Sequence, residues 1–288
     1  MRDSRLTKSV RAGVVALLCL WSLGPLLIGV STSLSTPLET KETPTRWIPR
    51  EPDFSAYEAL LGGAGEESGV GNDAAADASV FPEAMKNSIV VTLVSTAAVL
   101  LVAVLAGYGF SRLRFAGSAA LLAVVLAAMV VPLFTLVVAL FRLLAELDLV
   151  NTMPGLVMVY ITATAPLAIW LFFNYCRELP PDPEEAALID GCSRFGAFVR
   201  VVLPQMRSGI AALTAITMLG VWGQFLIPLL LTSTQETKPV TVVITEFIGK
   251  YTTNYPLLTA AGILAVIPPA IVALALNRHI RGMLSAGG

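Results

Sequence analysis

The sequence predicts an all-α membrane protein with six transmembrane helices and a short cytoplasmic helix between the fourth and the fifth. Of its 288 residues, 56% are hydrophobic and only 14% are charged, whereas soluble domains carry about 25% charged residues. The mean hydropathy is +0.76. Runs of about 20 apolar residues, the length that a helix needs to cross a bilayer, occur at 12–34, 88–110, 117–141, 152–176, 208–231 and 257–276.

The first apolar run follows a basic N-terminal segment, residues 1–11, with Arg2, Arg5, Lys8 and Arg11. A charged start before an apolar stretch is also typical of a signal peptide. Here the stretch 12–34 is longer than a signal-peptide core, and no A-x-A cleavage site follows it. We therefore expect a retained transmembrane helix.

The distribution of basic residues predicts the topology, because cytoplasmic loops carry the excess of Lys and Arg. With the N-terminus inside, twelve basic residues fall on the cytoplasmic side and seven on the other. Both termini are then cytoplasmic, including the tail 281–288, and 88–280 forms a five-helix core. The twelve are Arg2, Arg5, Lys8, Arg11, Arg112, Arg114, Arg177, Arg194, Arg200, Arg207, Arg278 and Arg281.

The first outer loop, 35–87, contains a stretch at 62–79 that is rich in Gly, Ala, Asp and Glu and has no aromatic residue. Such a composition buries too little apolar surface to offset the entropy of ordering, which predicts disorder. Trp47, Phe54, Tyr57 and Phe81 flank this stretch, and their aromatic rings favour packing at the membrane surface. Contact with a partner protein is the alternative.

The spans hold almost no ionisable side chain, and the two candidates, Arg142 and Glu246, lie near predicted ends or loops. Ion-coupled carriers usually hold carboxylates or histidines within the membrane. The chain also has no G-x-x-x-x-G-K-[ST] phosphate-binding loop, so we do not expect it to bind ATP through such a loop. An ion-coupled carrier, and an intramembrane enzyme with a Ser–His pair or paired carboxylates, are therefore less favoured.

No metal site, cofactor or nucleic-acid surface is predicted. Cys19, Cys176 and Cys192 have no metal-binding or C-x-x-C spacing, and one histidine cannot form a histidine cluster. Basic residues do not cluster with interleaved aromatic residues, as they do in nucleic-acid-binding proteins. We expect neither a catalytic site nor a bound cofactor in this chain.

The segment 179–204, between the fourth and fifth spans, differs sharply from its apolar surroundings. Asp182 followed by Pro183 predicts a helix start, with a capping side chain and proline in the first turn. Glu184 and Glu185 follow in that turn, where the helix dipole favours acids. Gly191 allows a sharp exit from the helix.

A second amphipathic stretch then leads to Pro204 and the fifth span, with apolar side chains at Phe195, Phe198, Val199, Val201 and Val202. On physical grounds alone, the whole segment 179–204 is either a solvated interfacial loop or a docking helix for a partner.

This segment resembles the EAA loop of binding-protein-dependent ABC importer permeases, whose pattern is E-A-A, three residues, G, nine residues, I-x-L-P. Glu185-Ala186-Ala187, then Gly191, then 201–204 (V-V-L-P) match every spacing, with valine replacing isoleucine. The likeness is greatest to the smaller six-span partner in the carbohydrate (maltose-type) family. It extends to Asn87-Ser88-Ile89 with Thr92, to 108–115, to Asn151-Thr152 with Gly155, and to 166–170.

The resemblance implies that 179–204 contains a coupling helix seated in a cleft of an ATPase subunit. The implied ATPase-docking residues are Glu184, Glu185, Ala186, Ala187, Asp190 and Gly191. The implied partners are an ATPase dimer, a second permease and an extracytoplasmic solute-binding protein. The implied activity is uptake of a di- or oligosaccharide or a related glycoside, with a polyol or sugar-phosphate as the alternative.

Candidate pathway residues lie on the fourth and fifth spans, which flank the coupling loop. Sugars are bound by aromatic faces with amide and hydroxyl groups, and the candidates are Tyr160, Thr164, Asn174, Trp222 and Gln224. The family often has W-N-x-F where this chain has W-G-Q-F at 222–225, so Gly223 removes an amide. Helix–helix packing is the alternative role for each residue, above all for Tyr160.

Overall fold

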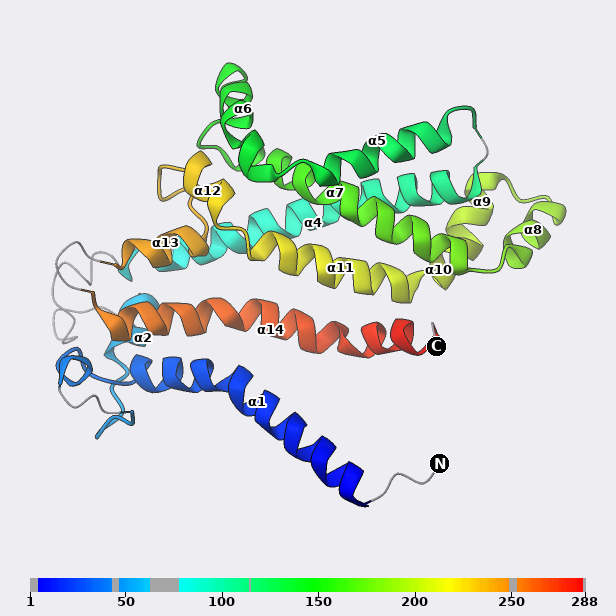
Figure 1. Cartoon of the computed structure of the whole chain (residues 1–288). Helices are drawn as coiled ribbons and strands as arrows, with labels where there is room; N and C mark the ends of the chain where they lie inside the picture. The colour runs from blue at the N-terminus through cyan, green and yellow to red at the C-terminus, as the bar shows by residue number, and fades with distance from the viewer. Residues whose placement is uncertain (1–4, 43–46, 63–77, 114, 249–252, 287–288) are drawn as a thin grey trace. The chain divides into compact units, whose positions relative to one another are not determined.

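In a computed structural model, the chain is described for residues 5–42, 47–62, 78–113, 115–248 and 253–286, and every regular element there is helical (Figure 1). The predicted disordered stretch 62–79 falls outside the described residues except at 62, 78 and 79. So do residues 1–4 of the predicted N-terminal segment and 287–288 of the tail. The long helices are α1 (Arg5–Ser33), α4 (Phe81–Arg112), α7 (Met153–Glu178) and α14 (Tyr255–Ala286).

Shorter helices connect or extend these four. They are α2 (Ser55–Leu60), α5 (Ser118–Val130), α6 (Leu133–Glu146), α8 (Asp182–Ile189), α9 (Arg194–Ala197), α10 (Leu203–Gln205), α11 (Arg207–Trp222), α12 (Leu226–Leu231) and α13 (Val240–Glu246). A 3-10 turn covers Glu39–Lys41, and a π-helical turn covers Phe198–Val202 between α9 and α10.

Among the described residues, four helices are long and apolar enough to cross a membrane, and six spans result if each of two bent helix pairs counts as one. The predicted third span, 117–141, is therefore two helices, because α5 and α6 meet at 106°. Pro132 explains the break, since proline disfavours helical geometry in the residue before it. Val131 is accordingly extended, with ψ 119°.

The predicted fifth span, 208–231, is also interrupted. Helix α11 ends at Trp222 with Gly223 as its C-cap, and α12 begins only at Leu226. On its other side, α11 meets the segment Arg194–Gln205 at 73°. The span that follows the coupling segment is thus built from short helices joined by bends.

The chain divides into two compact units, residues 1–85 with 242–267 and residues 86–241 with 268–288. In the first unit, the hydroxyls of Ser33 and Tyr57 share a 2.7 Å hydrogen bond that ties α2 to the end of α1. Of the aromatic residues predicted at the membrane surface, Trp47 and Phe54 are exposed, whereas Phe81 is only 2% exposed and packs inside.

The second unit contains the segment 179–204 and the predicted pathway residues. Helices α5 and α11 both pack on α7, and α4 approaches α7 closely, because a Cβ on Gly107 would lie 3.0 Å from Phe172. A core that includes Val99, Phe172 and Leu213 lies between α4, α7 and α11. Helices α8, α9 and α10 lie at one end of these helices, and α12 at the other (Figure 1).

Two asparagines hold the segment between α12 and α13 in place. Asn151 Oδ1 accepts hydrogen bonds from the Ser233 backbone N–H at 2.8 Å and from the Thr237 hydroxyl at 2.6 Å. Asn87 Nδ2 donates to the backbone oxygen of Lys238 at 3.2 Å. The starts of α4 and α7 are thereby joined to the segment between α12 and α13, opposite the end that carries α8.

Candidate functional site

The predicted helix in 179–204 is present as α8, and its first turn is held by backbone atoms. The N–H groups of Glu184 and Glu185 both donate to the Pro181 carbonyl at 3.0 Å. Asp182 was expected to cap the helix, but it is the first helical residue, and Pro181 occupies the cap position without a side-chain bond. The Pro181 carbonyl already accepts the first amides, which leaves no need for a capping side chain.

The C-terminal end of α8 turns on glycine, as the sequence predicted. Gly191 has a φ of +89°, a left-handed conformation that costs non-glycine residues about 1–2 kcal/mol. The Cys192 N–H returns to the Ala187 carbonyl at 3.0 Å and closes the turn. Ser193 then starts α9 by accepting a hydrogen bond from the Gly196 N–H at 3.1 Å.

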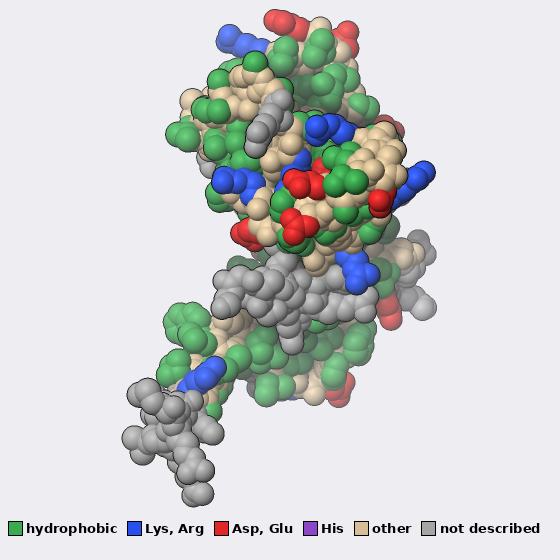
Figure 2. All heavy atoms as spheres, turned by 90° about the vertical axis from the view of Figure 1, so that its right-hand side faces the viewer, with side chains coloured by type: hydrophobic (Ala, Val, Ile, Leu, Met, Phe, Trp, Pro, Cys, Tyr) green, Lys and Arg blue, Asp and Glu red, His purple; other side chains and the backbone are tan. Residues whose placement is uncertain are grey.

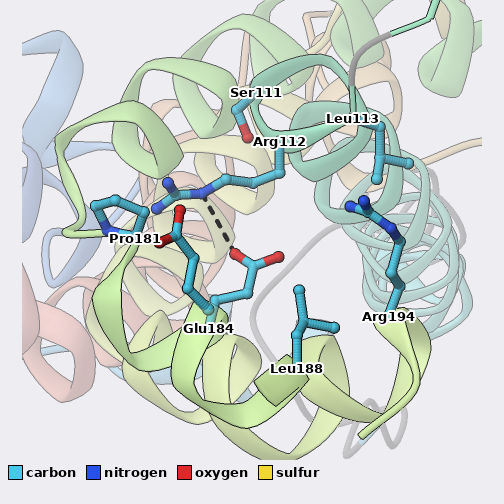
Figure 3. A pocket seen from close by; sticks show the side chains of 8 residues that line it. Ser111, Arg112, Leu113, Pro181, Glu184, Leu188 and Arg194 are labelled. Carbon is cyan, nitrogen blue, oxygen red and sulfur yellow. Dashed lines mark ion pairs between the residues drawn. The ribbon is translucent and has the colours of Figure 1, made fainter. Parts of the chain in front are cut away.

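The two adjacent glutamates of α8 both line the cavity at the end of α4 but differ in burial. Successive residues of a helix lie about 100° apart around its axis, at 3.6 residues per turn. Glu184 is 8% exposed, whereas Glu185 is exposed. The Tyr108 hydroxyl donates to Glu184 Oε1 at 2.6 Å, and Arg112 Nε lies 3.5 Å from Glu184 Oε2 (Figure 3).

Arg112 joins three elements at this point. It is the last residue of α4, and its Nη2 donates to the Leu179 carbonyl at 2.7 Å, in the link between α7 and α8. Within the described part of the chain, Arg112 Nε and Glu184 Oε2 have no hydrogen-bond partner and face each other only as an ion pair. Because both charges are largely buried, each depends on the other for compensation.

Tyr108 also contacts the second half of the coupling segment. Its ring centroid lies 4.4 Å from that of Phe198, which begins the π-helical turn and is 5% exposed. Of the apolar side chains predicted for this amphipathic half, Phe198 and Val202 are buried as expected, whereas Phe195 and Val199 are exposed. The tyrosine thus contacts α8 through its hydroxyl and the π-helical turn through its ring.

An open cavity of about 740 Å³ lies between the end of α4, α8 and α9. Figure 3 shows Arg112 and Glu184 facing each other in it, with Arg194 on the α9 side. On the outer surface of this end, Figure 2 shows acidic and basic side chains interspersed with apolar ones. Ile189 at 86% and Phe195 at 72% exposure are the most open apolar side chains of α8 and α9.

A second cavity, of about 250 Å³, lies between α7 and α11. It brings together two of the predicted pathway residues, Thr164 of α7 and Gln224, which follows α11. The remaining lining residues are Ala163, Leu167, Ala168, Leu171, Leu213, Ile216, Thr217 and Gly220. We call this cavity the α7–α11 groove.

The other predicted pathway residues lie elsewhere. Tyr160 is 1% exposed and belongs to a core cluster, which agrees with the packing alternative. Asn174 donates its side-chain amide to the Trp170 carbonyl at 2.8 Å, one turn earlier in α7. Trp222 is half-buried at the end of α11.

Sequence reasoning missed three residues that the structure places in these sites. Tyr108 and Arg112 were noted only for the family resemblance and, in the case of Arg112, for the topology, and nothing in the local pattern links them to Glu184. Thr217 was detectable, because it precedes Gln224 by seven residues and such residues share one face of a helix.

Comparisons with known proteins agree with this architecture. Residues 80–283 match the family described as "Binding-protein-dependent transport system inner membrane component". The chain is 29% identical over 281 residues to the sulfoquinovosyl glycerol transport system permease protein SmoH of Agrobacterium fabrum, covering 98% of this chain and 93% of SmoH. It is 34% identical over 203 residues to the diacetylchitobiose uptake system permease protein NgcG of Streptomyces coelicolor, covering 70% and 67%.

A third relative is the trehalose/maltose transport system permease protein MalG of Thermococcus litoralis, with 31% identity over 208 residues, covering 72% of this chain and 75% of MalG. Among solved structures, a bacterial ABC transporter involved in the import of the acidic polysaccharide alginate superposes with a TM-score of 0.78 at 20% identity. The match covers 96% of this chain and 98% of the other. The fold is therefore that of an ABC importer permease.

Proposed function

The chain belongs to the family of inner membrane components of binding-protein-dependent transport systems, and from this premise we propose that it translocates a carbohydrate and receives movement from an ATPase through α8. It is a multi-pass membrane protein that functions in an ABC transporter with a periplasmic binding protein. ATP is hydrolysed by a separate subunit of that transporter.

The exposed surface of α8 supports the docking role. Glu185, Ala186 and Ile189 are exposed on α8, and Asp190, which caps its C-terminal end, is exposed as well. The small side chain of Ala186 lets a partner approach the helix backbone closely, and Glu185 is available to a basic residue of the ATPase. Docking needs no chemistry from these residues, only a surface that stays rigid when the ATPase subunits close.

The substrate class rests on two observations. The relatives SmoH, NgcG and MalG are named for sulfoquinovosyl glycerol, diacetylchitobiose and trehalose/maltose, all of which contain sugars. The α7–α11 groove places Thr164, Thr217 and Gln224 in an otherwise apolar lining. A few polar groups on an apolar wall suit a sugar, which has apolar C–H faces and many hydroxyls. We therefore favour a di- or oligosaccharide or a related glycoside.

The proposed complex has one copy of this chain, a second permease, an ATPase dimer and a solute-binding protein outside the membrane. Both termini lie in the cytoplasm, as the excess of basic residues predicts. Labelling the wild-type Cys192 and an engineered cysteine at Ser233 with a membrane-impermeant reagent in intact cells tests this orientation. Ser233 should react and Cys192 should not, and the reverse pattern would contradict the topology.

Reconstitution tests the function directly. The four components are placed in liposomes with ATP inside, and uptake of labelled trehalose, maltose and diacetylchitobiose is measured beside a polyol and a sugar-phosphate. We expect sugar uptake that requires the binding protein, stops with vanadate and persists with ionophores. Uptake without the ATPase that ionophores abolish would instead indicate an ion-coupled carrier, and uptake of the polyol or sugar-phosphate alone would change the substrate class.

A further inference from the structure

We propose that Glu184 is a positioning residue that locks the coupling helix α8 to the C-terminal end of α4, so that the two move as one rigid body during transport. This inference rests on the proposed role of α8 in docking. It assigns different tasks to two adjacent acids that line the same open cavity, because Glu184 is buried against Tyr108 and Arg112 whereas Glu185 is exposed.

Direct contacts between α4 and α8 support the lock. Tyr108 and Arg112 lie four residues apart, on one face of the last turns of α4, and both reach Glu184. The hydrogen bond is short, at 2.6 Å, as expected for a hydroxyl that donates to a carboxylate. With Glu184 8% exposed, water competes little for these contacts.

Two further contacts fix the direction of α8. Arg112 donates a hydrogen bond to the Leu179 carbonyl. The same residue of α4 therefore contacts both Glu184 and the chain just before α8. The Tyr108 ring packs on Phe198, beyond the C-terminal side of α8. Contacts before, within and after α8 restrain both its position and its rotation about its own axis.

This arrangement has a consequence for how movement passes into the membrane. The main chain connects α8 to α7 on one side and, through α9 and α10, to α11 on the other. Arg112, at the end of α4, precedes Leu179 by 67 residues in sequence. Helix α4 therefore receives movement from α8 only through side-chain contacts. Breaking the Glu184 contacts should therefore leave α8 joined to α7 and α11 by the main chain but let it shift against the end of α4, which the core holds on α7.

The test measures a distance within the chain in the reconstituted transporter. Cys19 is replaced by serine, Cys176 stays because it is buried, and nitroxide labels are placed on Leu113→Cys and the native Cys192. Cys192 reports on α8 through its bond to Ala187, and Leu113 reports on α4 through its bond to Gly109. Pulsed electron resonance gives the label distance without nucleotide and after trapping with vanadate.

The lock predicts the same distance in both states of the wild type. Glu184→Gln and Tyr108→Phe should each broaden the distribution and shift it between states. Both should lower uptake about three- to tenfold at normal assembly, a range typical of single positions that carry coupling. Because Glu184→Gln removes the ion pair and Tyr108→Phe removes the hydrogen bond, the two variants test the contacts separately.

Two matched variants serve as controls. Tyr175→Phe removes a tyrosine hydroxyl that bonds Ser208 at 2.9 Å between α7 and α11, away from α8. Glu185→Gln neutralises the exposed neighbour of Glu184, for which no contact with Tyr108 or Arg112 is described. Neither should change the label distance. A wild-type label distance that changes on trapping would overturn the lock. Label distances in Glu184→Gln and Tyr108→Phe equal to those in Tyr175→Phe would overturn it too. In either case, normal sugar uptake by the wild type would leave the proposed function intact.

Discussion

Tyr108 and Glu184 lie 76 residues apart in sequence and share a 2.6 Å hydrogen bond between α4 and α8. The same tyrosine ring packs 4.4 Å from Phe198. One side chain of a membrane helix therefore contacts both halves of the coupling segment. The family pattern in 179–204 therefore covers only one side of this contact, because the residues against which the segment packs belong to α4.

At Gly191, in the turn after α8, the backbone conformation alone should determine which substitutions are tolerated. A Cβ on Gly191 would meet nothing within 4 Å, so only its φ of +89° limits what fits. Gly191→Leu should cost about 1–2 kcal/mol and uncouple or disassemble the complex, and Gly191→Pro should do the same because proline fixes φ near −65°. Co-purification of the ATPase and sugar uptake are the two measurements.

Gly191→Asn is the matched control, because asparagine enters the left-handed region more readily than other non-glycine residues. It should retain most of the assembly and uptake that Gly191→Leu loses. If Gly191→Leu keeps both at the wild-type level, this segment has no coupling role and is an ordinary interfacial loop.

Charge at Glu185 should affect docking more than the stability of the chain. Its side chain is exposed and has no hydrogen bond or ion pair among the contacts described for this chain. Glu185→Ala should reduce ATPase co-purification less than about fivefold, because exposed ion pairs contribute little. Glu185→Lys should reduce it further by adding repulsion against a basic partner. Equal co-purification for the two variants would argue against a basic partner surface.

The approach of α7 to α11 should be sensitive to one methyl group. A Cβ on Gly209 would collide with the Tyr175 ring, whereas a Cβ on Gly220 of the same helix would meet nothing within 4 Å. Gly209→Ala should lower the free energy of unfolding by about 1–3 kcal/mol through overpacking. Gly220→Ala should raise it by up to about 1 kcal/mol. Thermal unfolding in detergent compares the two.

A double variant checks the cause of this effect. In Gly209→Ala combined with Tyr175→Leu, the ring that causes the collision is absent, so the two losses of stability should be less than additive. Strict additivity would show that Gly209 acts through something other than Tyr175.

Polar residues of the α7–α11 groove should affect uptake more than stability. Thr217→Val and Gln224→Leu each remove hydrogen-bonding groups from the lining and should lower sugar uptake about five- to tenfold. Thr162→Val is the control, because this exposed threonine of α7 bonds the Met158 carbonyl at 2.9 Å and does not line the groove. Uptake should be unchanged there. Equal effects at all three positions would rule out the groove as the pathway.

Much of the fold could be predicted from the sequence. Long apolar runs require helices wherever lipid replaces water, since only internal hydrogen bonds can satisfy the backbone there. The existence of α8 and its end at Gly191 were also predictable, because proline, acids, alanines and glycine act on the backbone locally. The breaks near Pro132 and Gly223 were missed, although both residues were visible, because apolar composition alone gave the length of each span.

The sequence by itself thus determined the helices, the coupling motif and the six apolar runs, since these depend on neighbouring residues. Only the tertiary structure decided that Glu184 is buried against Tyr108 and Arg112 while Glu185 stays exposed, and that Thr164 lines a groove while Tyr160 lies in a core. The physical reason is the packing of other helices, which the local sequence does not describe. Glu184 and Glu185 lie about 100° apart around α8, whereas Tyr160 and Thr164 share a face of α7 and differ in position along it. In both pairs, the neighbouring helices determine which residue is buried.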